Sequence, residues 1–154
     1  MQIKMKRLLP GMGRSLYKAL LVGLLPAMTA VGTLRAQNPD YKVVFDLTSK
    51  DTAVQRTVIR WVNEISKSDK DARLEVVLYG QSLDMVVSGR SVAEDAIRKW
   101  ADNKNISFKV CAVAMKKHNI DKSELIPGVQ IVPDGIYEII TMQRQGWGYI
   151  KAAP

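Results

Sequence analysis

The sequence predicts an α/β fold in which a mostly parallel sheet carries helices on both faces. Short apolar runs alternate along the chain with segments of helical periodicity, which is the order of successive βαβ units. The runs at residues 41–47 and 74–79 are nearly continuously apolar, as is typical of strands buried on both faces. The chain shows no internal repeat, so we expect one domain over residues 37–154, long enough for a single core.

Two strands and a helix are predicted first. Residues 41–47 form a strand, and residues 52–55 have the pattern of a capping box that opens a helix. Apolar residues then recur at helical spacing: Val54, Val58, Trp61 and Ile65. A polar loop at residues 67–72 leads to the strand at residues 74–79, which Gly80 ends.

The middle of the chain predicts a short turn and a helix. The apolar stretch at residues 83–87 is expected to form one helical turn. Ser91 and Glu94 have the spacing of a second capping box. The buried stripe of the helix that follows is expected to be Ala93, Ala96, Ile97 and Trp100.

The rest of the chain continues the alternation. The predicted elements are a strand at residues 106–110, a helix at 112–118 ended by Asn119, a turn at 121–125, a strand at 129–132, a helix carrying Ile136, Ile139 and Ile140, and a strand at 147–150. Asp134 is placed to cap the last helix, and Gly146 lies beyond its end.

Residues 1–36 are predicted to be a cleaved secretory signal. Basic residues extend through Lys18, an apolar run covers residues 19–31, and small residues precede Ala36, after which we expect cleavage. The run is shorter than the roughly 20 residues of a membrane anchor and contains a proline. We therefore expect an exported protein, periplasmic or secreted, with no membrane segment after cleavage. Met12 is an alternative start.

The net charge of +8 does not indicate a nucleic-acid-binding protein, because the excess lies in the predicted signal. Residues 1–36 hold six Lys and Arg and no acidic residue, which leaves 17 basic against 15 acidic side chains in the rest. The single cysteine excludes an internal disulfide framework, and the single histidine argues against a His/Cys zinc site. We expect no metal and no other cofactor.

Cys111 is the leading candidate for chemistry, because it falls where a strand ends and a helix begins. Ligands of parallel α/β sheets bind outside the carboxyl ends of the strands. A thiol at a helix N-terminus also meets unpaired backbone N–H groups and the positive end of the helix dipole, which favour the thiolate. The alternative is a buried structural cysteine, since free cysteine behaves as a small apolar residue.

Four further residues are weaker candidates for binding. His118 shares a helix face with Cys111 but lies about 10 Å along the axis, too far for a direct bond to the thiol. A solvated helix end is the alternative for His118. Lys116, with its neighbour Lys117, is either anion-holding or a plain surface lysine. Asp46 ends a strand at the same sheet edge, as a functional or a loop-stabilising carboxylate. The fourth candidate, Tyr79, is named for the family resemblance given below.

Several common sites find no support in the sequence. The loop at residues 47–52 lacks glycine, so it matches neither the Walker A loop nor the dinucleotide fingerprint. The chain has no G-x-S-x-G elbow of a serine hydrolase. The tryptophans are expected to pack in the core: Trp61, Trp100 and Trp147.

Three stretches of the chain carry a resemblance to a known family. They are residues 42–46 followed by a helix, residues 74–80 with Leu83 and Met85 after them, and residues 108–115 continued by Ile120, Leu125, 127–129, Val132, Pro133 and 145–150. In this order they resemble the DsrE/DsrF-like family of sulfur-relay proteins, and in particular its exported, single-domain branch.

The resemblance implies a three-layer α/β/α domain with a five-stranded parallel sheet, and a homo-oligomer, commonly a trimer or hexamer. It implies that Cys111 accepts sulfane sulfur as a persulfide and passes it to an acceptor protein, as a carrier more than as a catalyst. Related exported members often have histidine where this chain has Tyr79. Tyrosine does not titrate near neutral pH, so the assistance of a histidine is lost or replaced here.

Two functions are therefore open. In the first, the protein handles sulfane sulfur through Cys111. In the second, it is a non-enzymatic binding or assembly module with an inert cysteine and with Tyr79 at a ligand-lined sheet edge. The reactivity of the thiol in the folded protein distinguishes them. A flavodoxin-type domain is a third possibility, against which the glycine-poor loop at residues 47–52 counts.

Overall fold

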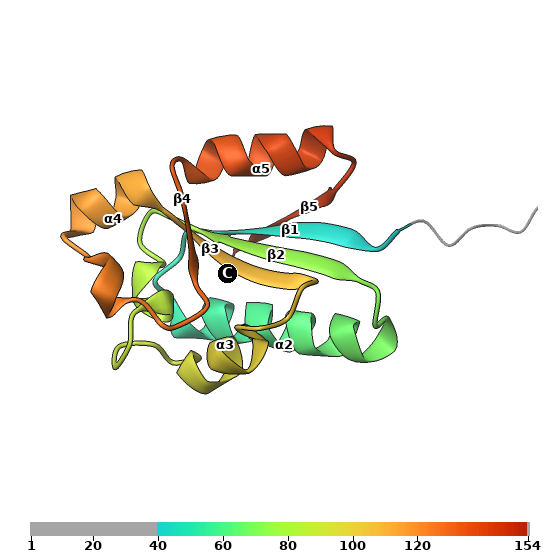
Figure 1. The fold of residues 1–154 in the computed structure, drawn as a ribbon, viewed down its shortest axis with the longest axis horizontal. Helices are drawn as coiled ribbons and strands as arrows, with labels where there is room; N and C mark the ends of the chain where they lie inside the picture. Colours follow the sequence, from blue (N-terminus) through green and yellow to red (C-terminus); the bar gives the residue numbers. More distant parts are fainter. Residues whose placement is uncertain (1–39, 154) are drawn as a thin grey trace, which may run out of the picture. The chain divides into compact units, whose positions relative to one another are not determined.

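Five strands and four helices alternate along residues 40–153, the part of the chain that the computed structural model describes (Figure 1). In chain order the elements are β1 (Lys42–Leu47), α2 (Thr52–Ser68), β2 (Arg73–Leu78), the 3₁₀ turn η1 (Leu83–Val86), α3 (Glu94–Trp100), β3 (Ile106–Cys111), α4 (Ala112–His118), the 3₁₀ turn η2 (Lys122–Glu124), β4 (Gln130–Val132), α5 (Gly135–Arg144) and β5 (Gly148–Ala152). The predicted strands and helices are confirmed, with small shifts at their ends. The predicted signal, residues 1–36, lies outside the described residues. No helix within residues 40–153 is long and apolar enough to cross a membrane.

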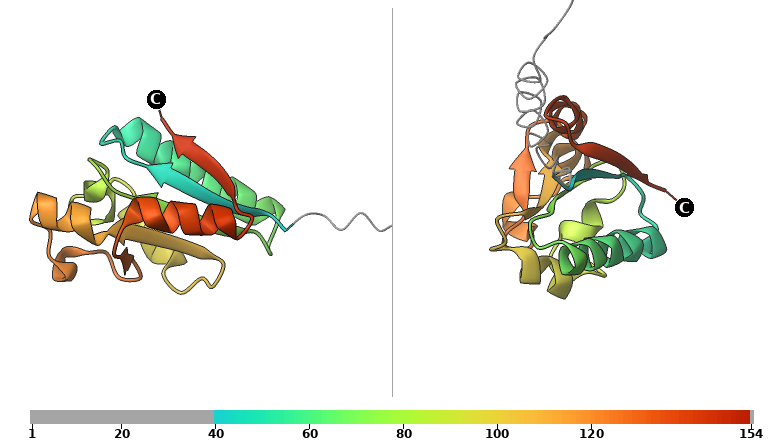
Figure 2. Two further views of the ribbon diagram at one scale, coloured as in Figure 1. Left: turned by 90° about the horizontal axis from the view of Figure 1, so that it is seen from above. Right: turned by 90° about the vertical axis from the view of Figure 1, so that its right-hand side faces the viewer.

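The strands form one parallel sheet in the order β4-β3-β2-β1-β5. The strands β1 to β4 follow one another across the sheet in chain order. α5 then returns the chain to the free edge of β1, where β5 pairs. Because crossovers between parallel strands are right-handed, this reversal puts α5 on the face opposite α2 and α3, as Figure 1 shows. The right-hand view of Figure 2 has the sheet between α5 and α2. The three-layer α/β/α prediction is confirmed, and the sheet is wholly parallel.

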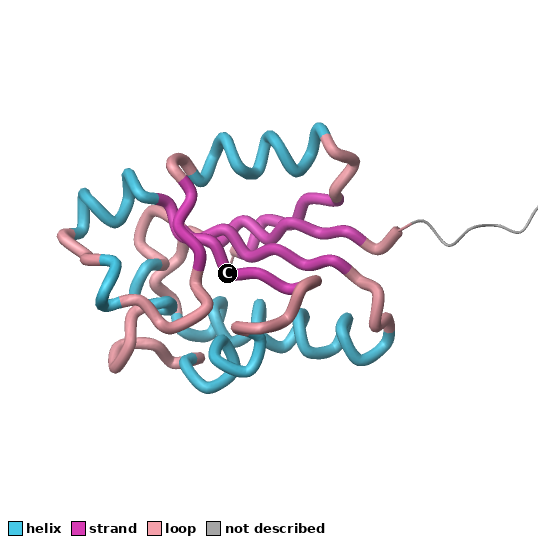
Figure 3. The backbone as a smooth tube through the Cα atoms, in the orientation of Figure 1, coloured by secondary structure: helices cyan, strands magenta, loops and turns pink. Residues whose placement is uncertain are grey.

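The larger core fills the space between the sheet and the layer of α2 and α3, which Figure 3 shows in cyan below the strands. Alternate residues of β1 point into it, among them the fully buried Phe45 and Leu47. The ring of Trp61 stacks on Phe45 with the centroids 5.9 Å apart. Trp100 packs against the same core and Trp147 is half-buried.

The face under α5 has a much smaller apolar core. Its buried apolar side chains are Val44, Val77 and Ile139, with Tyr79 and Met142 packed against them. Charged side chains share this face, and the outer side of α5 leaves apolar residues exposed: Ile136, Tyr137 and Ile140. Apolar burial therefore attaches α5 to the sheet less firmly than it attaches α2.

Two predicted capping boxes are wrong in detail. The cap of α2 is Asp51, one residue earlier than predicted, because its extended backbone lets the carboxylate accept the Ala53 N–H at 2.8 Å. Glu94 does not return to Ser91 but accepts the N–H of Gly89 at 2.8 Å. A complete capping box forms instead in η2, between the side chains and backbone of Asp121 and Glu124.

The first turn of α5 lies unusually close to the sheet. Asp134 caps the helix, as predicted, by accepting the backbone N–H groups of Ile136 and Tyr137 at 2.8 and 3.1 Å. A Cβ atom on Gly135, the first helical residue, would lie 3.2 Å from both the Cβ of Cys111 and the Cγ1 of Val77. Only glycine therefore fits at this position without displacing the helix or its neighbours.

We predict that Gly135→Ala destabilises the protein by about 1–3 kcal/mol, the usual cost of overpacking. In an uncrowded helix the same change would stabilise by roughly 0.5–1 kcal/mol. Urea unfolding measures the difference, with Gln143→Ala on the exposed side of α5 as the control. A gain in stability for Gly135→Ala would contradict the close approach.

Candidate functional site

Cys111 ends β3 and is the residue from which α4 begins. Its backbone is extended, with φ −73° and ψ 121°, so the chain turns from strand into helix directly after it. It pairs in register with Val132 of the neighbouring strand β4. Gly135 of α5 packs against it from one face of the sheet. The thiol therefore lies at the carboxyl edge of the sheet, between the starts of two helices, and the residue is only 6% exposed.

A pocket of about 400 Å³ opens beside Cys111. Apolar side chains from the two helices, Val113 and Ile136, form one part of its lining, and Lys117 and His118 bring positive charge or hydrogen-bonding capacity to another. Asp134, the N-cap of α5, also lines the pocket. The pocket is therefore largely apolar with a few polar groups near a thiol, as small-molecule sites usually are.

The structure brings three of the predicted site residues together at this pocket, Cys111, Tyr79 and His118. Lys116 is exposed and does not line the pocket, whereas its neighbour Lys117 does. Of the two lysines, Lys117 is therefore the one placed to meet a molecule in the pocket. Within residues 40–153, no hydrogen bond joins His118 to Cys111.

Asp46 is buried outside the pocket lining and binds the last strand. Its carboxylate accepts the Tyr149 hydroxyl at 2.7 Å and the Lys151 ammonium at 3.0 Å. Lys151 also donates to the Thr48 hydroxyl at 3.1 Å and lies 5.7 Å from the ring centroid of Tyr79. These bonds favour the loop-stabilising alternative for Asp46, and they show that its carboxylate binds the strand β5 as well.

Tyr79 connects the Asp46 cluster to the pocket. Burial, and then the Asp46 carboxylate, raise the pKa of Tyr79 above its ordinary value of 10.0. The hydrogen bond to Asp46 likewise raises the pKa of Tyr149. Tyr79 is therefore a neutral phenol at physiological pH, with no proton exchange near neutrality.

Tyr149 and Lys151 are site-supporting residues that the sequence analysis missed. They stand two residues apart on β5, and a strand puts such residues on one face. Their alternation was visible in the sequence, but their partner was not, because β5 pairs with β1 and not with the strand that precedes it in the chain.

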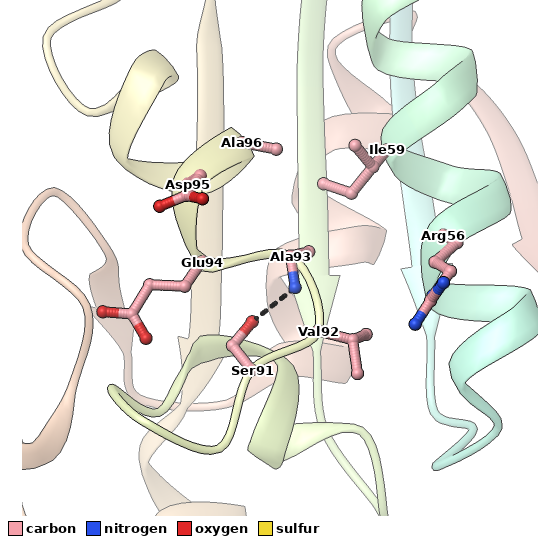
Figure 4. A pocket seen from close by; sticks show the side chains of 8 residues that line it. All are labelled: Arg56, Ile59, Ser91, Val92, Ala93, Glu94, Asp95 and Ala96. Carbon is pink, nitrogen blue, oxygen red and sulfur yellow. Dashed lines mark hydrogen bonds between the residues drawn. The ribbon is translucent and has the colours of Figure 1, made fainter.

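A second pocket, of about 330 Å³, lies between α2 and the start of α3 (Figure 4). Arg56, Ile59 and Val92 are among its lining residues, and Ser91 accepts the Ala93 N–H there at 3.0 Å. No cysteine or histidine lines it. Residues 40–153 also contain no group of three or more His, Cys, Asp or Glu placed to hold a metal. The Cys111 pocket is therefore the candidate functional site.

Three solved structures share the fold. The protein of unknown function MTH1491 from Methanobacterium thermoautotrophicum is 25% identical, with a TM-score of 0.67 over 73% of this chain and 99% of that one. The ychN protein from E. coli is 14% identical, with a TM-score of 0.60 over 71% and 97%. The conserved protein of unknown function BT1422 from Bacteroides thetaiotaomicron is 14% identical, with a TM-score of 0.59 over 72% and 94%.

A match of the sequence to a protein family agrees with this likeness in fold. No curated protein matches it significantly, but the DsrE/DsrF-like family matches over residues 33–152, which is most of the chain and all five strands. The chain belongs to the DsrE/DsrF-like family.

Proposed function

We propose that the protein carries sulfane sulfur as a persulfide on Cys111. The observation that carries the proposal is the position of this cysteine, the single one in the sequence, on the wall of a pocket at the carboxyl edge of the sheet. In the loading step the Cys111 thiolate attacks the outer sulfur of a donor persulfide. A new S–S bond forms, the donor S–S bond breaks, and its electron pair leaves on the donor thiolate, so no oxidant is needed.

The surroundings of Cys111 suit a carrier better than a catalyst of turnover. The chain has no second cysteine to resolve the persulfide, so the sulfur must leave to another molecule. His118 lines the pocket without a bond to the thiol, and Tyr79 keeps its proton. Burial of Cys111 protects a bound sulfur from solvent oxidants, which matters for a lone thiol in an oxidising compartment.

A binding or assembly module with an inert cysteine is the second candidate. The low exposure of Cys111 and the tyrosine at position 79 favour it. In that case the pocket binds a ligand without sulfur transfer.

The mass of the intact, reduced protein before and after exposure to a persulfide donor separates the two candidates. We expect a gain of one sulfur atom that is lost on reduction and is absent in Cys111→Ser. Failure of the folded protein to gain sulfur, with alkylation of Cys111 only after denaturation, would favour the inert module.

We also predict that Lys117 accelerates loading by an anionic donor such as thiosulfate, whose sulfite leaves as Cys111 takes the outer sulfur. An exposed charge acting over a few ångströms is worth up to about 1 kcal/mol, so Lys117→Gln should slow loading by roughly threefold to fivefold. Lys116→Gln, which removes the same charge outside the pocket, is the matched control. Equal effects of the two substitutions would exclude a specific role for Lys117.

We propose further that the protein forms a homo-oligomer through the exposed apolar side of α5. Ile140 is 40% exposed there, and Ile136 and Tyr137 adjoin it. We expect Ile140→Glu to lower the molecular mass measured by light scattering to that of a monomer. Val92→Glu, equally exposed at 40% near the start of α3, should leave the mass unchanged. A monomeric parent protein would refute the proposal.

Export, with protein donors or acceptors of sulfur outside the cytoplasm, completes the proposed function. The order of basic, apolar and small residues in the first 36 positions supports it, and the family match begins only at residue 33. N-terminal sequencing of the protein recovered from its native compartment tests both export and cleavage after Ala36.

A further inference from the structure

A buried ion network joins α5 to the sheet beside the candidate site. The Lys109 ammonium lies 2.7 Å from Oε2 of Glu75 and 2.6 Å from Oε1 of Glu138. The side chain of Glu75 is 4% exposed, and those of Lys109 and Glu138 are each 17% exposed. The three groups come from β2, β3 and α5, so one lysine holds together three separate elements.

Stability alone does not explain this network. Two carboxylates share one ammonium, and Oε1 of Glu75 is buried without a hydrogen-bond partner among the described residues. Burial is the main cause that raises the pKa of Glu75, against the pull of Lys109. Burial also opposes the charge of Lys109, but the bonds to Glu138 and Glu75 prevail and raise its pKa. Well-packed apolar residues often stabilise a protein as much as a buried ion pair does, or more.

The network does fix a position that the small apolar core leaves weakly defined. Apolar burial is non-directional, whereas a buried charge that loses its partner is strongly destabilising. Val44, Val77 and Ile139 are the buried apolar residues of this face. The bond from Lys109 to Glu138 is thus the directional contact between α5 and β3.

The contact between Lys109 and Glu138 lies close to Cys111 along both β3 and α5. Lys109 stands two residues before Cys111 on β3, on the same side of the strand, about 6.6 Å away along it. Glu138 stands three residues after Gly135 on α5, about 4.5 Å along the helix. Fixing Glu138 on Lys109 therefore fixes Gly135 on Cys111, where a Cβ would already be 3.2 Å from the cysteine.

We propose that Glu75, Lys109 and Glu138 are positioning residues for Cys111, which set the register of α5 on β3 and thereby the access of reagents to the thiol. The significance of this access for sulfur transfer rests on the proposed function. The positioning itself does not, because an alkylating reagent probes the thiol whether or not it carries sulfur.

The test is the rate at which iodoacetamide alkylates Cys111 in the folded protein. Glu138→Gln keeps the shape of the side chain and removes its charge, and Lys109→Met removes the shared ammonium. With the first turn of α5 released, we expect alkylation to accelerate at least fivefold in both variants. Lys109→Arg can still donate to both carboxylates, so it should restore a rate close to that of the parent protein.

A control separates positioning from loss of stability. Val62→Ala in the fully buried core on the opposite face should destabilise by about 1–3 kcal/mol without changing the alkylation rate in the absence of urea. If the alkylation rates of the network variants do not change between zero and 1 M urea, the thiol is exposed by local opening at α5, because alkylation through global unfolding would accelerate with urea.

Two results would overturn the proposal. One is an unchanged rate in Glu138→Gln, the variant least disturbing to the fold. The other is acceleration in Val62→Ala equal to that in the network variants. Persulfide loading measured on the same samples keeps the two hypotheses apart: a parent protein that takes up no sulfur refutes the carrier function, while the alkylation rates still decide the positioning role.

Discussion

The close approach of α5 to the sheet at Gly135 is the constraint on which the candidate site depends. A side chain at that position would meet Cys111 and Val77 at 3.2 Å, so the absence of one lets a helix start directly over a strand end. The Asp134 cap, the thiol at the end of β3 and the phenol of Tyr79 gather around this contact. A pocket opens beside it, lined by residues of α4 and α5, the helices that follow the neighbouring strands β3 and β4.

The two faces of the sheet serve different purposes. The face under α2 and α3 is packed with apolar side chains, among them Phe45, and supplies most of the apolar burial that stabilises the domain. The face under α5 is small in apolar area and carries the cluster at Asp46 and the network at Lys109. Most of the apolar burial and the buried carboxylates of Asp46 and Glu75 thus lie on opposite sides of the same five strands.

Much of this arrangement follows from the sequence, because hydrophobic periodicity defines the strands and helices and thereby places Cys111 at a strand end. Lys116 and Lys117 could not be ranked, since periodicity does not fix the rotation of a short polar helix about its axis. Glu75 and Lys109 are polar residues within largely apolar strands, and nothing in their local sequence connects them. Their pairing needs the cross-strand register and the position of Glu138, which depend on the order of strands in space.

The strand order has a consequence for when the protein can fold. β1 is the first strand of the domain to be synthesised and β5 the last, yet they are neighbours. Until residues 148–152 are made, one edge of β1 has no partner, and the carboxylate of Asp46 lacks both Tyr149 and Lys151. Such long-range pairings form late, since the closure of the long loop must precede any gain from the contact. The domain therefore completes its fold only after nearly all of it has left the ribosome.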